Sequence, residues 1–458
     1  MAVAVDMATG QDEQLREALA HARSSHFYAD RIPAAAGTAT DWLASVPLTR
    51  RSDLTKAPPF ARQAGPREEL WQYVESSGTT GSGTLAAGYT RDDMARSVTG
   101  LNPTFLELFD RGRTVLNRFP YPLAAVSSTL EWLARERGAC IVPAGNLSWL
   151  VPFDRALDLL RRVKPDVMAA LPLEPVILAV LAEHLGIPRR ELWGSVDTII
   201  AGGGPLPAAL TEILEGDFGV RVVELYGSTE TMAIGTGCRE RRLHLSTGNF
   251  VIEVMDPELW TPVRSGEPGA LVLTSLHLRA MPLVRYVNED IVQLDTTPCP
   301  CGSGQPSIRV LGRLGETIRL SGRTLYPTEV LDAAFRFAAA HESRVLLTIV
   351  HAQGIHLRVE VAEPKAAPGE AALADLRNAL GVRVDVQLVR RGDLLDCESL
   401  IKVPRVYKPA PIVDWRGSAR RPYTLMEALI SLPSMGLADL RRIATRTLRN
   451  YLSKRRVR

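Results

Sequence analysis

The stretch from Glu75 to Thr84, ESSGTTGSGT, has no large apolar side chain and consists almost entirely of glycine and hydroxyl residues. Glycine lets a backbone approach an anion closely, and backbone N–H groups together with Ser and Thr hydroxyls donate hydrogen bonds to phosphate oxygens. No lysine follows the second glycine, so this is not the G-x-x-x-x-G-K-[ST] loop. The stretch indicates a phosphate cradle, with a flexible surface loop as the alternative.

Two more polar motifs follow apolar runs that are typical of buried strands. AGGGP (201–205) follows VDTII, and YGSTE (226–230) follows RVVEL. Ligands in open α/β sheets bind beyond the carboxyl ends of the strands, where loops and helix N-termini meet. Both motifs are therefore candidates for the same site.

The elements that position these motifs alternate between strands and helices. Strands are expected within 138–145, 165–172, 196–203 and 221–227, and helices over 154–163 and 207–218. An amphipathic helix with Leu15, Leu19 and Ala22 on one stripe precedes them. This alternation predicts an α/β fold with a largely parallel sheet covered by helices.

The length of 458 residues favours a large domain and a smaller one. After Leu311 the pattern changes to two strands, a helix and another strand, which predicts a small α+β domain. We expect a large domain at 1–311, a small mobile domain at 312–415 and a basic helical tail at 416–458. Three roles are open for the tail: a solvated helix, a binding site for an acidic carrier protein or for the phosphates of CoA, or attachment to a membrane surface.

Composition excludes several classes of protein. The net charge of +3 is too small to indicate a nucleic-acid partner, and no apolar run is long enough to cross a membrane. The N-terminus lacks the pattern of a secretory signal, so we expect a cytoplasmic protein. Five cysteines, an odd number, argue against a disulfide framework and leave metal binding or burial.

The order of the motifs resembles that of the adenylate-forming ligases, most closely the phenylacetate–CoA ligase branch. After the three motifs above come Arg285-Tyr286, Asp290, Gly312-Arg313 and Lys402. REELWQYVESSGTTG, PCPCGSGQPSIRVLGR and GRTLYPTEVLDAAF are also similar to segments of that branch, and the resemblance covers residues 15–415. It implies ATP as a substrate and a small domain that rotates between two half-reactions.

The resemblance implies a role for residues in each motif. Tyr226 offers a ring face to adenine, Asp290 accepts hydrogen bonds from the ribose hydroxyls, and Arg313 adds a charged donor. Thr229 reaches the α-phosphate, and Glu230 holds Mg²⁺ against the phosphates. The full set of expected nucleotide contacts is Ser77, Gly78, Thr79, Thr80, Gly81, Gly203, Gly204, Pro205, Tyr226, Gly227, Ser228, Asp290 and Arg313.

The resemblance assigns catalysis to a lysine near the end of the small domain. Its ammonium stabilises the negative charge that builds up when a carboxylate attacks the α-phosphate. The family motif G-K-x-x-R corresponds here to IKVPR, with Lys402 and Arg405 at the expected spacing and Ile401 in place of glycine. Lys408 is the competing candidate, and a surface lysine is the alternative.

Two further positions depart from the family pattern. Ser82-Gly83 stands where the family usually has Lys-Pro, which removes a phosphate-binding cation. Gly315 stands where the family usually has an acidic hinge residue, and glycine still permits a large backbone rotation.

Four of the residues that commonly bind zinc fall in two pairs near these motifs, Cys238 with His244 and Cys299 with Cys301. Three thiolates and one imidazole suit tetrahedral zinc, and some members of the family share the positions. We expect a structural zinc site that pins two loops near the nucleotide, with free buried thiols as the alternative. Cys140 and Cys397 are expected to be structural.

The acid pocket is expected to include Phe119, Tyr121, Trp149 and Leu171, which favour an aromatic or other hydrophobic acid. The alternative is that these residues belong to the hydrophobic core and do not contact the acid.

Together these features predict an AMP-forming acid–CoA ligase that uses Mg·ATP. The alternatives are transfer to an amine or a carrier protein in secondary metabolism, including amide-forming, carrier-loading or diazo-forming ligation. The alternative outside the enzymes is a non-catalytic protein of the same fold that binds a nucleotide without turning it over.

Overall fold

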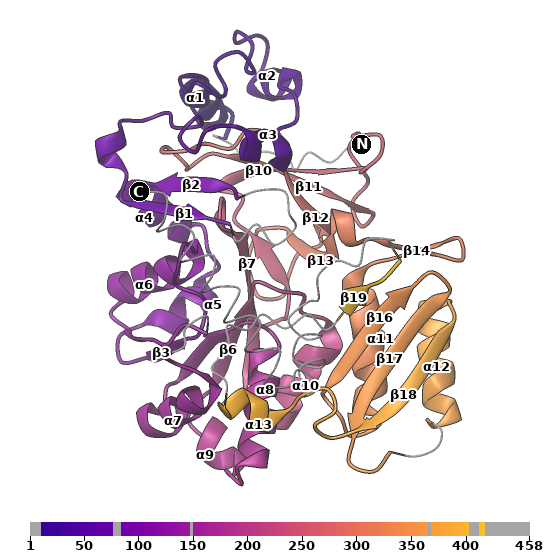
Figure 1. The fold of residues 1–458 in the computed structure, drawn as a ribbon. Coiled ribbons are helices and arrows are strands. Elements are labelled where there is room, and N and C mark those ends of the chain that lie inside the picture. Colours follow the sequence, from indigo (N-terminus) through magenta and orange to yellow (C-terminus); the bar gives the residue numbers. More distant parts are fainter. Residues whose placement is uncertain (1–10, 77–83, 147–149, 365–367, 403–411, 417–458) are drawn as a thin grey trace, which may run out of the picture. The chain divides into compact units, whose positions relative to one another are not determined.

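A computed structural model describes residues 11–76, 84–146, 150–364, 368–402 and 412–416 (Figure 1). The packing divides the chain into two units, Met1–Ala333 with Pro404–Val406, and Ala334–Val403 with Tyr407–Arg458. This division falls after Ala333, whereas the sequence indicates a small domain from residue 312. The boundary at residue 312 stays a prediction.

The first unit begins with the helices α1 (Gln11–Arg23), α2 (Ala39–Ser45) and α3 (Arg51–Lys56). The structure confirms α1 as the expected amphipathic helix, and Leu15 and Leu19 are buried in one cluster with Trp42 of α2. The hairpin of β1 (Gln72–Glu75) and β2 (Ala86–Tyr89) follows. Its connection contains the glycine-rich segment.

Five parallel strands form one half of an 11-stranded sheet, in the order β4-β3-β5-β6-β7. They are β3 (Thr114–Asn117), β4 (Cys140–Pro143), β5 (Val167–Ala170), β6 (Thr198–Gly202) and β7 (Arg221–Ser228). The helices of this part are α4 (Arg91–Thr99), α5 (Pro103–Leu106), α6 (Ala125–Arg137), α7 (Phe153–Val163), α8 (Glu174–His184), α9 (Arg189–Trp193) and α10 (Ala208–Phe218). The alternation expected from the sequence is confirmed here.

The other half of the sheet is antiparallel, which corrects the expectation of a largely parallel sheet. Beyond β7 the order is β8, β9, β13, β12, β11 and β10. These strands are β8 (Met232–Gly237), β9 (Leu243–Leu245), β10 (Phe250–Met255), β11 (Pro268–Ser275), β12 (Tyr286–Asp295) and β13 (Ser307–Arg313). Strands such as β8 and β11 are buried on both faces, so their uniform hydrophobicity did not distinguish them from parallel strands.

The sheet is strongly curved, and side chains of β7 and β12 meet. The two strands are four positions apart, about 19 Å in a flat sheet. Nevertheless, Tyr226 Oη on β7 lies 2.6 Å from Asp290 Oδ2 on β12. At the bulge between β7 and β8, a Cβ on Gly227 would lie 2.0 Å from the carbonyl oxygen of Met232, so only glycine fits. A buried apolar cluster that includes Tyr226 lines the curve, with Ile234, Phe250, Leu271, Leu273 and Val292 among its members.

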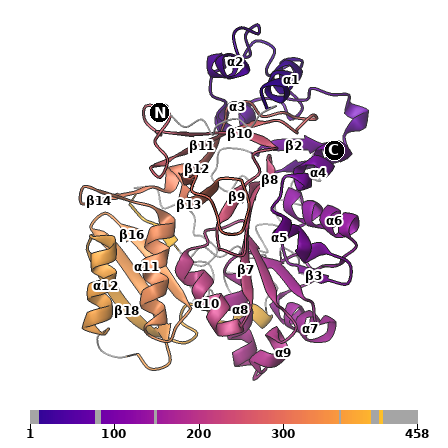
Figure 2. The same ribbon diagram turned by 180° about the vertical axis from the view of Figure 1, so that it is seen from behind.

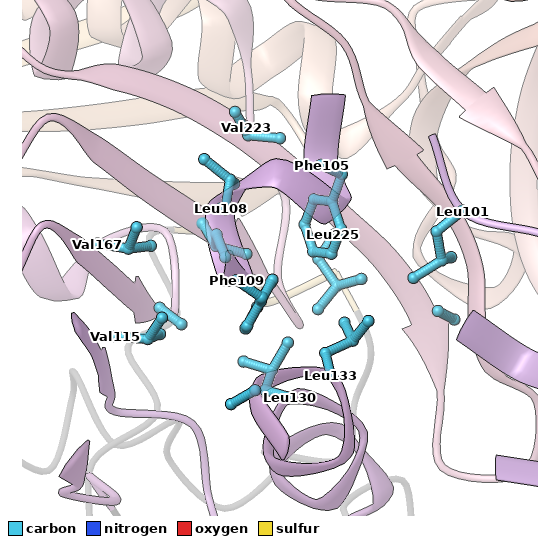
Figure 3. Close-up of a cluster of buried hydrophobic side chains, with 14 of the residues drawn as sticks. Leu101, Phe105, Leu108, Phe109, Val115, Leu130, Leu133, Val167, Val223 and Leu225 are labelled. Carbon is cyan, nitrogen blue, oxygen red and sulfur yellow. The ribbon is translucent and has the colours of Figure 1, made fainter. Parts of the chain in front are cut away.

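A second apolar cluster packs against the opposite side of β7 (Figure 3). Figure 3 shows side chains of α5, the turn η2 (Glu107–Phe109), α6 and the strands pointing toward one another, including Phe105, Phe109, Leu130, Leu133, Val115, Val167, Val223 and Leu225. Because side chains alternate along a strand, Val223 and Leu225 enter this core while Tyr226 points the other way. The cluster fixes α6, and with it the connection from β3 to α6.

The second unit contains a four-stranded sheet in the order β18-β17-β16-β19. The strands are β16 (Leu346–His351), β17 (Gly354–Val361), β18 (Val384–Arg390) and β19 (Ile412–Asp414). Figure 2 shows α12 (Glu370–Leu380) on one face of this sheet, and α11 (Pro327–Ala339) crosses the boundary between the two units. The expected small α+β fold is thus confirmed.

The remaining elements are the turn η1 (Arg67–Glu69), the turn η3 (Leu314–Glu316), the hairpin of β14 (Ile318–Leu320) and β15 (Arg323–Leu325), and α13 (Cys397–Lys402). The basic tail, 417–458, lies outside the described residues. Within the described ranges, no helix combines the length and the apolar character that a membrane crossing requires.

Candidate active site

Ser76 holds together the two flanks of the glycine-rich segment. Its N–H donates to the carbonyl of Leu85 at 2.9 Å, and its hydroxyl accepts from the N–H of Leu85 at 2.9 Å. Arg51 Nη2 donates to the same hydroxyl oxygen at 2.6 Å. The expected phosphate contacts Ser77, Gly78, Thr79, Thr80 and Gly81 lie outside the described residues. The structure therefore defines where the segment begins and ends, beside a cation.

Tyr226, Asn288, Asp290 and Arg313 form one polar group inside the curve of the sheet. Asp290 Oδ2 accepts hydrogen bonds from Tyr226 Oη at 2.6 Å and from Asn288 Nδ2 at 2.8 Å. Arg313 Nε lies 3.1 Å from Asp290 Oδ1, and β12 and β13 pair these two residues in register. The structure thus brings together three of the residues that the sequence assigns to the nucleotide.

Burial determines the electrostatics of this group. It raises the pKa of Asp290, while the Arg313 guanidinium and the Tyr226 hydroxyl act in the opposite direction. Burial and the nearby carboxylate raise the pKa of Tyr226 well above its ordinary value, so this hydroxyl stays a donor. An ionised carboxylate accepts at about four positions, and three are used here. Asp290 can therefore accept one further hydroxyl.

Glu230 and Thr229 lie at the turn between β7 and β8. Glu230 is buried, and its Oε1 accepts from Tyr286 Oη at 2.6 Å and lies 3.6 Å from Arg51 Nη1. The hydroxyl of Tyr89 donates to the carbonyl oxygen of Thr229. Arg51 therefore links the expected Mg²⁺ ligand to the flank of the glycine-rich segment.

Gly203, Gly204 and Pro205 are exposed at the carboxyl end of β6, beside β7. Gly203 has φ +73°, in the left-handed region, which favours glycine. On the neighbouring turn, Ser228 N donates to Thr231 Oγ1 at 3.0 Å. Both motifs therefore border the same edge of the sheet, as expected.

Lys402 is the last residue of α13, in the second unit, and its side chain is outside what the structure describes. Arg405 and Lys408 lie in the undescribed segment 403–411. Gly315 lies in η3 directly after β13, with open space around the position of a Cβ. The roles of Lys402 and of the hinge stay predictions.

Sequence reasoning missed Arg51, Asn288 and Glu224. The missing lysine after the glycine-rich segment signalled that another cation is needed, but nothing in the pattern pointed to α3. Asn288 and Glu224 each precede an expected ligand by two residues, and the two-residue period of a strand puts them on the same face as Asp290 and Tyr226. This two-residue period could have identified Asn288 and Glu224 from the sequence.

The four expected zinc ligands, Cys238, His244, Cys299 and Cys301, form one cluster. Their ligand atoms all lie within 4.8 Å of one another, with Cys238 Sγ 3.8 Å from Cys299 Sγ and Cys301 Sγ 3.3 Å from His244 Nε2. Tetrahedral zinc with Zn–S bonds of about 2.3 Å requires a sulfur–sulfur distance of about 3.8 Å. His244 Nδ1 bonds the Gln305 carbonyl at 2.8 Å, which directs Nε2 toward the sulfurs. The donor set and its spacing fit zinc.

This cluster spans the narrowest connection in the large sheet. The three-residue strand β9 joins β8 to β13, and only two residue pairs connect it to β13. His244 lies in β9, Cys238 follows β8, and the other two cysteines lie between β12 and β13. A metal ion here would tie β8 and β9 to the connection between β12 and β13.

The residues expected to line the acid pocket differ in burial. Phe119 and Leu171 belong to the apolar cluster that packs against β7, and because Phe119 is fully buried there, it is explained as a core residue. Tyr121 is half-buried, and its Oη accepts from Asn117 Nδ2 at 3.1 Å. Trp149 lies outside the described residues.

Comparison with known proteins identifies the family of this chain. The sequence model of the AMP-binding enzyme family matches residues 5–278, more than half of the chain. The protein therefore belongs to the AMP-binding enzyme family. This confirms the resemblance to adenylate-forming enzymes.

Within the family, the chain lies in the phenylacetate–CoA ligase-like branch. It is 29% identical over 339 residues to the phenylacetate-coenzyme A ligase of Thermus thermophilus, covering 70% of this chain and 73% of that protein. It is 27% identical over 354 residues to that of Pseudomonas putida, covering 72% and 76%. A crystal structure of 2-hydroxyisobutyryl-CoA ligase in complex with 2-HIB-AMP aligns with a TM-score of 0.74 over 93% of both chains at 20% identity, which confirms the fold.

Glu224 is expected to make stability depend on pH. Burial raises the pKa of its carboxyl group to about 7, and no hydrogen bond or ion pair reaches it within the described part of the chain. Because the folded-state pKa lies above the unfolded value, the contribution to stability is full below about pH 4.5 and is lost as the pH rises through 7. Glu224→Gln should therefore melt at a higher temperature than the unsubstituted protein at pH 8, with a smaller difference at pH 5. A difference that does not change with pH contradicts this.

Proposed function

We propose that the protein activates a carboxylic acid with ATP and transfers the acyl group to coenzyme A. The carboxylate attacks the α-phosphorus of ATP and releases pyrophosphate, and the sulfur of CoA then attacks the acyl carbon and releases AMP. The observation that carries the proposal is the group formed by the buried Tyr226, Asn288 and Asp290 and the half-exposed Arg313, beside Glu230. The phenylacetate-coenzyme A ligases among its relatives support the same chemistry.

The polar group suits the adenosine part of ATP. Asp290 accepts a ribose hydroxyl at its remaining lone pair, and the ring of Tyr226 packs against adenine. Glu224 lies on the same face of β7, and its carboxylate suits the amino group of adenine. Arg313 balances the buried charge of Asp290, which would otherwise be costly without its partner.

The phosphates are assigned to the glycine-rich segment, Thr229 and Arg51. Arg51 supplies the cation that is missing where the family usually has Lys-Pro, because it contacts both Ser76 and Glu230. Glu230 is a buried carboxylate with no backbone donor in the described structure, which fits a hard cation. Mg²⁺ held there would neutralise charge on the phosphates.

Lys402 is assigned to the acid-activating step. Its ammonium stabilises charge on the α-phosphate and on the attacking carboxylate when the small domain is turned toward the site. The small domain then rotates at Gly315, which moves Lys402 away from the site and lets the thiol of CoA reach the acyl group. The half-buried ring of Tyr121 favours an aromatic acid.

The proposal predicts pyrophosphate release from Mg·ATP that depends on an acid and is stimulated by CoA. The assay uses aryl, aliphatic and amino acids and nitrite, each with and without CoA. Lys402→Ala should abolish release while ATP still binds, with Lys408→Ala as the matched control. Arg51→Ala should raise the KM for ATP.

Other outcomes redirect the assignment. Release that ignores CoA but responds to an amine, a carrier protein or nitrite moves the function to amide-forming, carrier-loading or diazo-forming ligation. ATP binding without release for any acid supports the non-catalytic alternative. Unchanged turnover in Lys402→Ala, with loss in Lys408→Ala, transfers the catalytic role to Lys408.

We also propose that the cysteine and histidine cluster holds a structural zinc ion. The support is the close set of ligand atoms and the orientation of His244 by the Gln305 carbonyl. Closed four-ligand sites of this kind stabilise folds rather than perform catalysis. Here the metal would keep the two halves of the nucleotide site in register.

Metal analysis of the purified protein should find one zinc ion per chain. Cys299→Ser and Cys301→Ser should lose the ion, melt at a lower temperature and bind ATP more weakly. Cys140→Ser, at an exposed thiol outside the cluster, should keep it. Fully folded protein that binds ATP and contains no zinc contradicts the proposal.

A further inference from the structure

A buried charged network occupies the carboxyl ends of β3, β4 and β5, on the opposite side of β6 from Tyr226. Arg118, directly after β3, is the largest fully buried side chain, and its Nε lies 2.5 Å from Oε1 of the buried Glu174. Arg118 Nη1 also donates to the carbonyls of Ala144 at 2.5 Å and Val151 at 3.0 Å. The nucleotide assignments use none of these residues.

Asn146 completes this network but leaves one atom without a partner. Its Nδ2 donates to Glu174 Oε2 at 2.9 Å, and its backbone N–H donates to the carbonyl of Arg118 at 2.9 Å. Its Oδ1 is buried and has no hydrogen bond partner among the residues that the structure describes. Rotating the amide by 180° would point the carbonyl at the Glu174 carboxylate, so the observed orientation is fixed by charge. The free position is therefore an acceptor.

An acceptor of this kind is unfavourable unless a donor arrives. Leaving a buried polar atom unpaired destabilises the folded protein, because the atom has lost its hydrogen bonds to water and gained none. The ion pair beneath it also carries a desolvation cost that an apolar core would avoid. A site that recognises an apolar acid needs neither feature. A ligand that donates a hydrogen bond to Asn146 Oδ1 would remove the first cost.

The network borders the region assigned to the acid. Gly145 packs against Tyr121, since a Cβ there would lie 2.8 Å from Tyr121 Cδ2. On the far side, a Cβ on Gly203 would lie 3.1 Å from Leu171 Cδ2, at the start of the segment that leads to Glu174. The ends of β3 and β6 are two strand spacings apart, about 10 Å. This span suits an aryl acid that lies along the edge with its carboxylate near β6.

We propose that Asn146 selects a carboxylic acid carrying a hydrogen bond donor, a hydroxyl or amino group, at the end remote from its carboxylate. This inference rests on the proposed acid-activating function and names its substrate class. Arg118 and Glu174 act as positioning residues, because they hold the amide with its oxygen free. Sites built to bind a substrate hydroxyl discriminate strongly against analogues that lack it.

The test measures acid-dependent pyrophosphate release for matched pairs of acids. Each pair consists of a 3- or 4-hydroxy or amino aryl acid and the methyl analogue of the same size, in the benzoate, phenylacetate and cinnamate series. The donor-bearing acid of at least one pair should have a kcat/KM about 10- to 100-fold higher, as expected for one buried hydrogen bond. Asn146→Leu should bring this ratio close to one by lowering kcat/KM for the donor-bearing acid only.

Asn249→Leu is the matched control, because Asn249 is as buried as Asn146 and bonds the carbonyls of Arg96 and Ser97. It should lower the melting temperature without changing the ratio. If Asn146→Leu does not fold, the kcat/KM ratio is measured with Asn146→Ala instead. The unsubstituted protein gives a second comparison, because the donor-bearing acid of a pair should raise its melting temperature more than the methyl analogue does.

The outcomes separate this inference from the function on which it rests. Release with equal kcat/KM within every pair overturns the selection by Asn146 and leaves acid activation intact. A loss in Asn146→Leu that is equal for both acids of a pair assigns the residue to folding and overturns the proposal. No release with any acid overturns the proposed function, and the substrate class with it.

Discussion

The site depends on one contact, the hydrogen bond between Tyr226 on β7 and Asp290 on β12. Strands four positions apart meet only in a sheet that curls tightly, and the glycine at position 227 allows this because a Cβ there would collide with the Met232 carbonyl. The curl brings Glu230 within reach of Tyr286 in the same way. Residues that are distant in sequence and in strand order thereby come into contact with one another.

Burial strengthens this contact, because the buried carboxylate of Asp290 has lost its hydrogen bonds to water. The apolar cluster around Tyr226 removes water, so each charge needs a partner, and Arg313 fulfils that role for Asp290. The cysteine and histidine cluster lies beyond β8, in β9 and between β12 and β13. Zinc bound there would hold β8 and β9 against β12 and β13, whereas Tyr226 and Asp290 are held by their own hydrogen bond.

Much of this was predictable from the sequence, because apolar runs and polar motifs alternate with clear periods. The strands β4, β5, β6 and β7 and the α+β fold of the second unit are confirmed. Tyr226, Asp290 and Arg313 lie together, and their contacts with a nucleotide stay a prediction. The antiparallel half was missed, since strands buried on both faces carry no sign of direction. Arg51 was missed because only its tertiary contacts, with Ser76 and Glu230, indicate a role for it. Lys402 belongs to a separate unit, and its role remains a prediction.

The most direct test of the account is a double-mutant cycle on ATP binding with Tyr226→Phe and Asp290→Ala, measured by calorimetry. Because the tyrosine hydroxyl orients the carboxylate, each substitution alone should weaken binding, and Tyr226→Phe should cost little more once Asp290 is absent. The expected coupling is about 1 kcal/mol or more, typical of a hydrogen bond to a charged group. Fully additive losses, or ATP binding that neither substitution affects, would contradict the claim that this contact builds the nucleotide site.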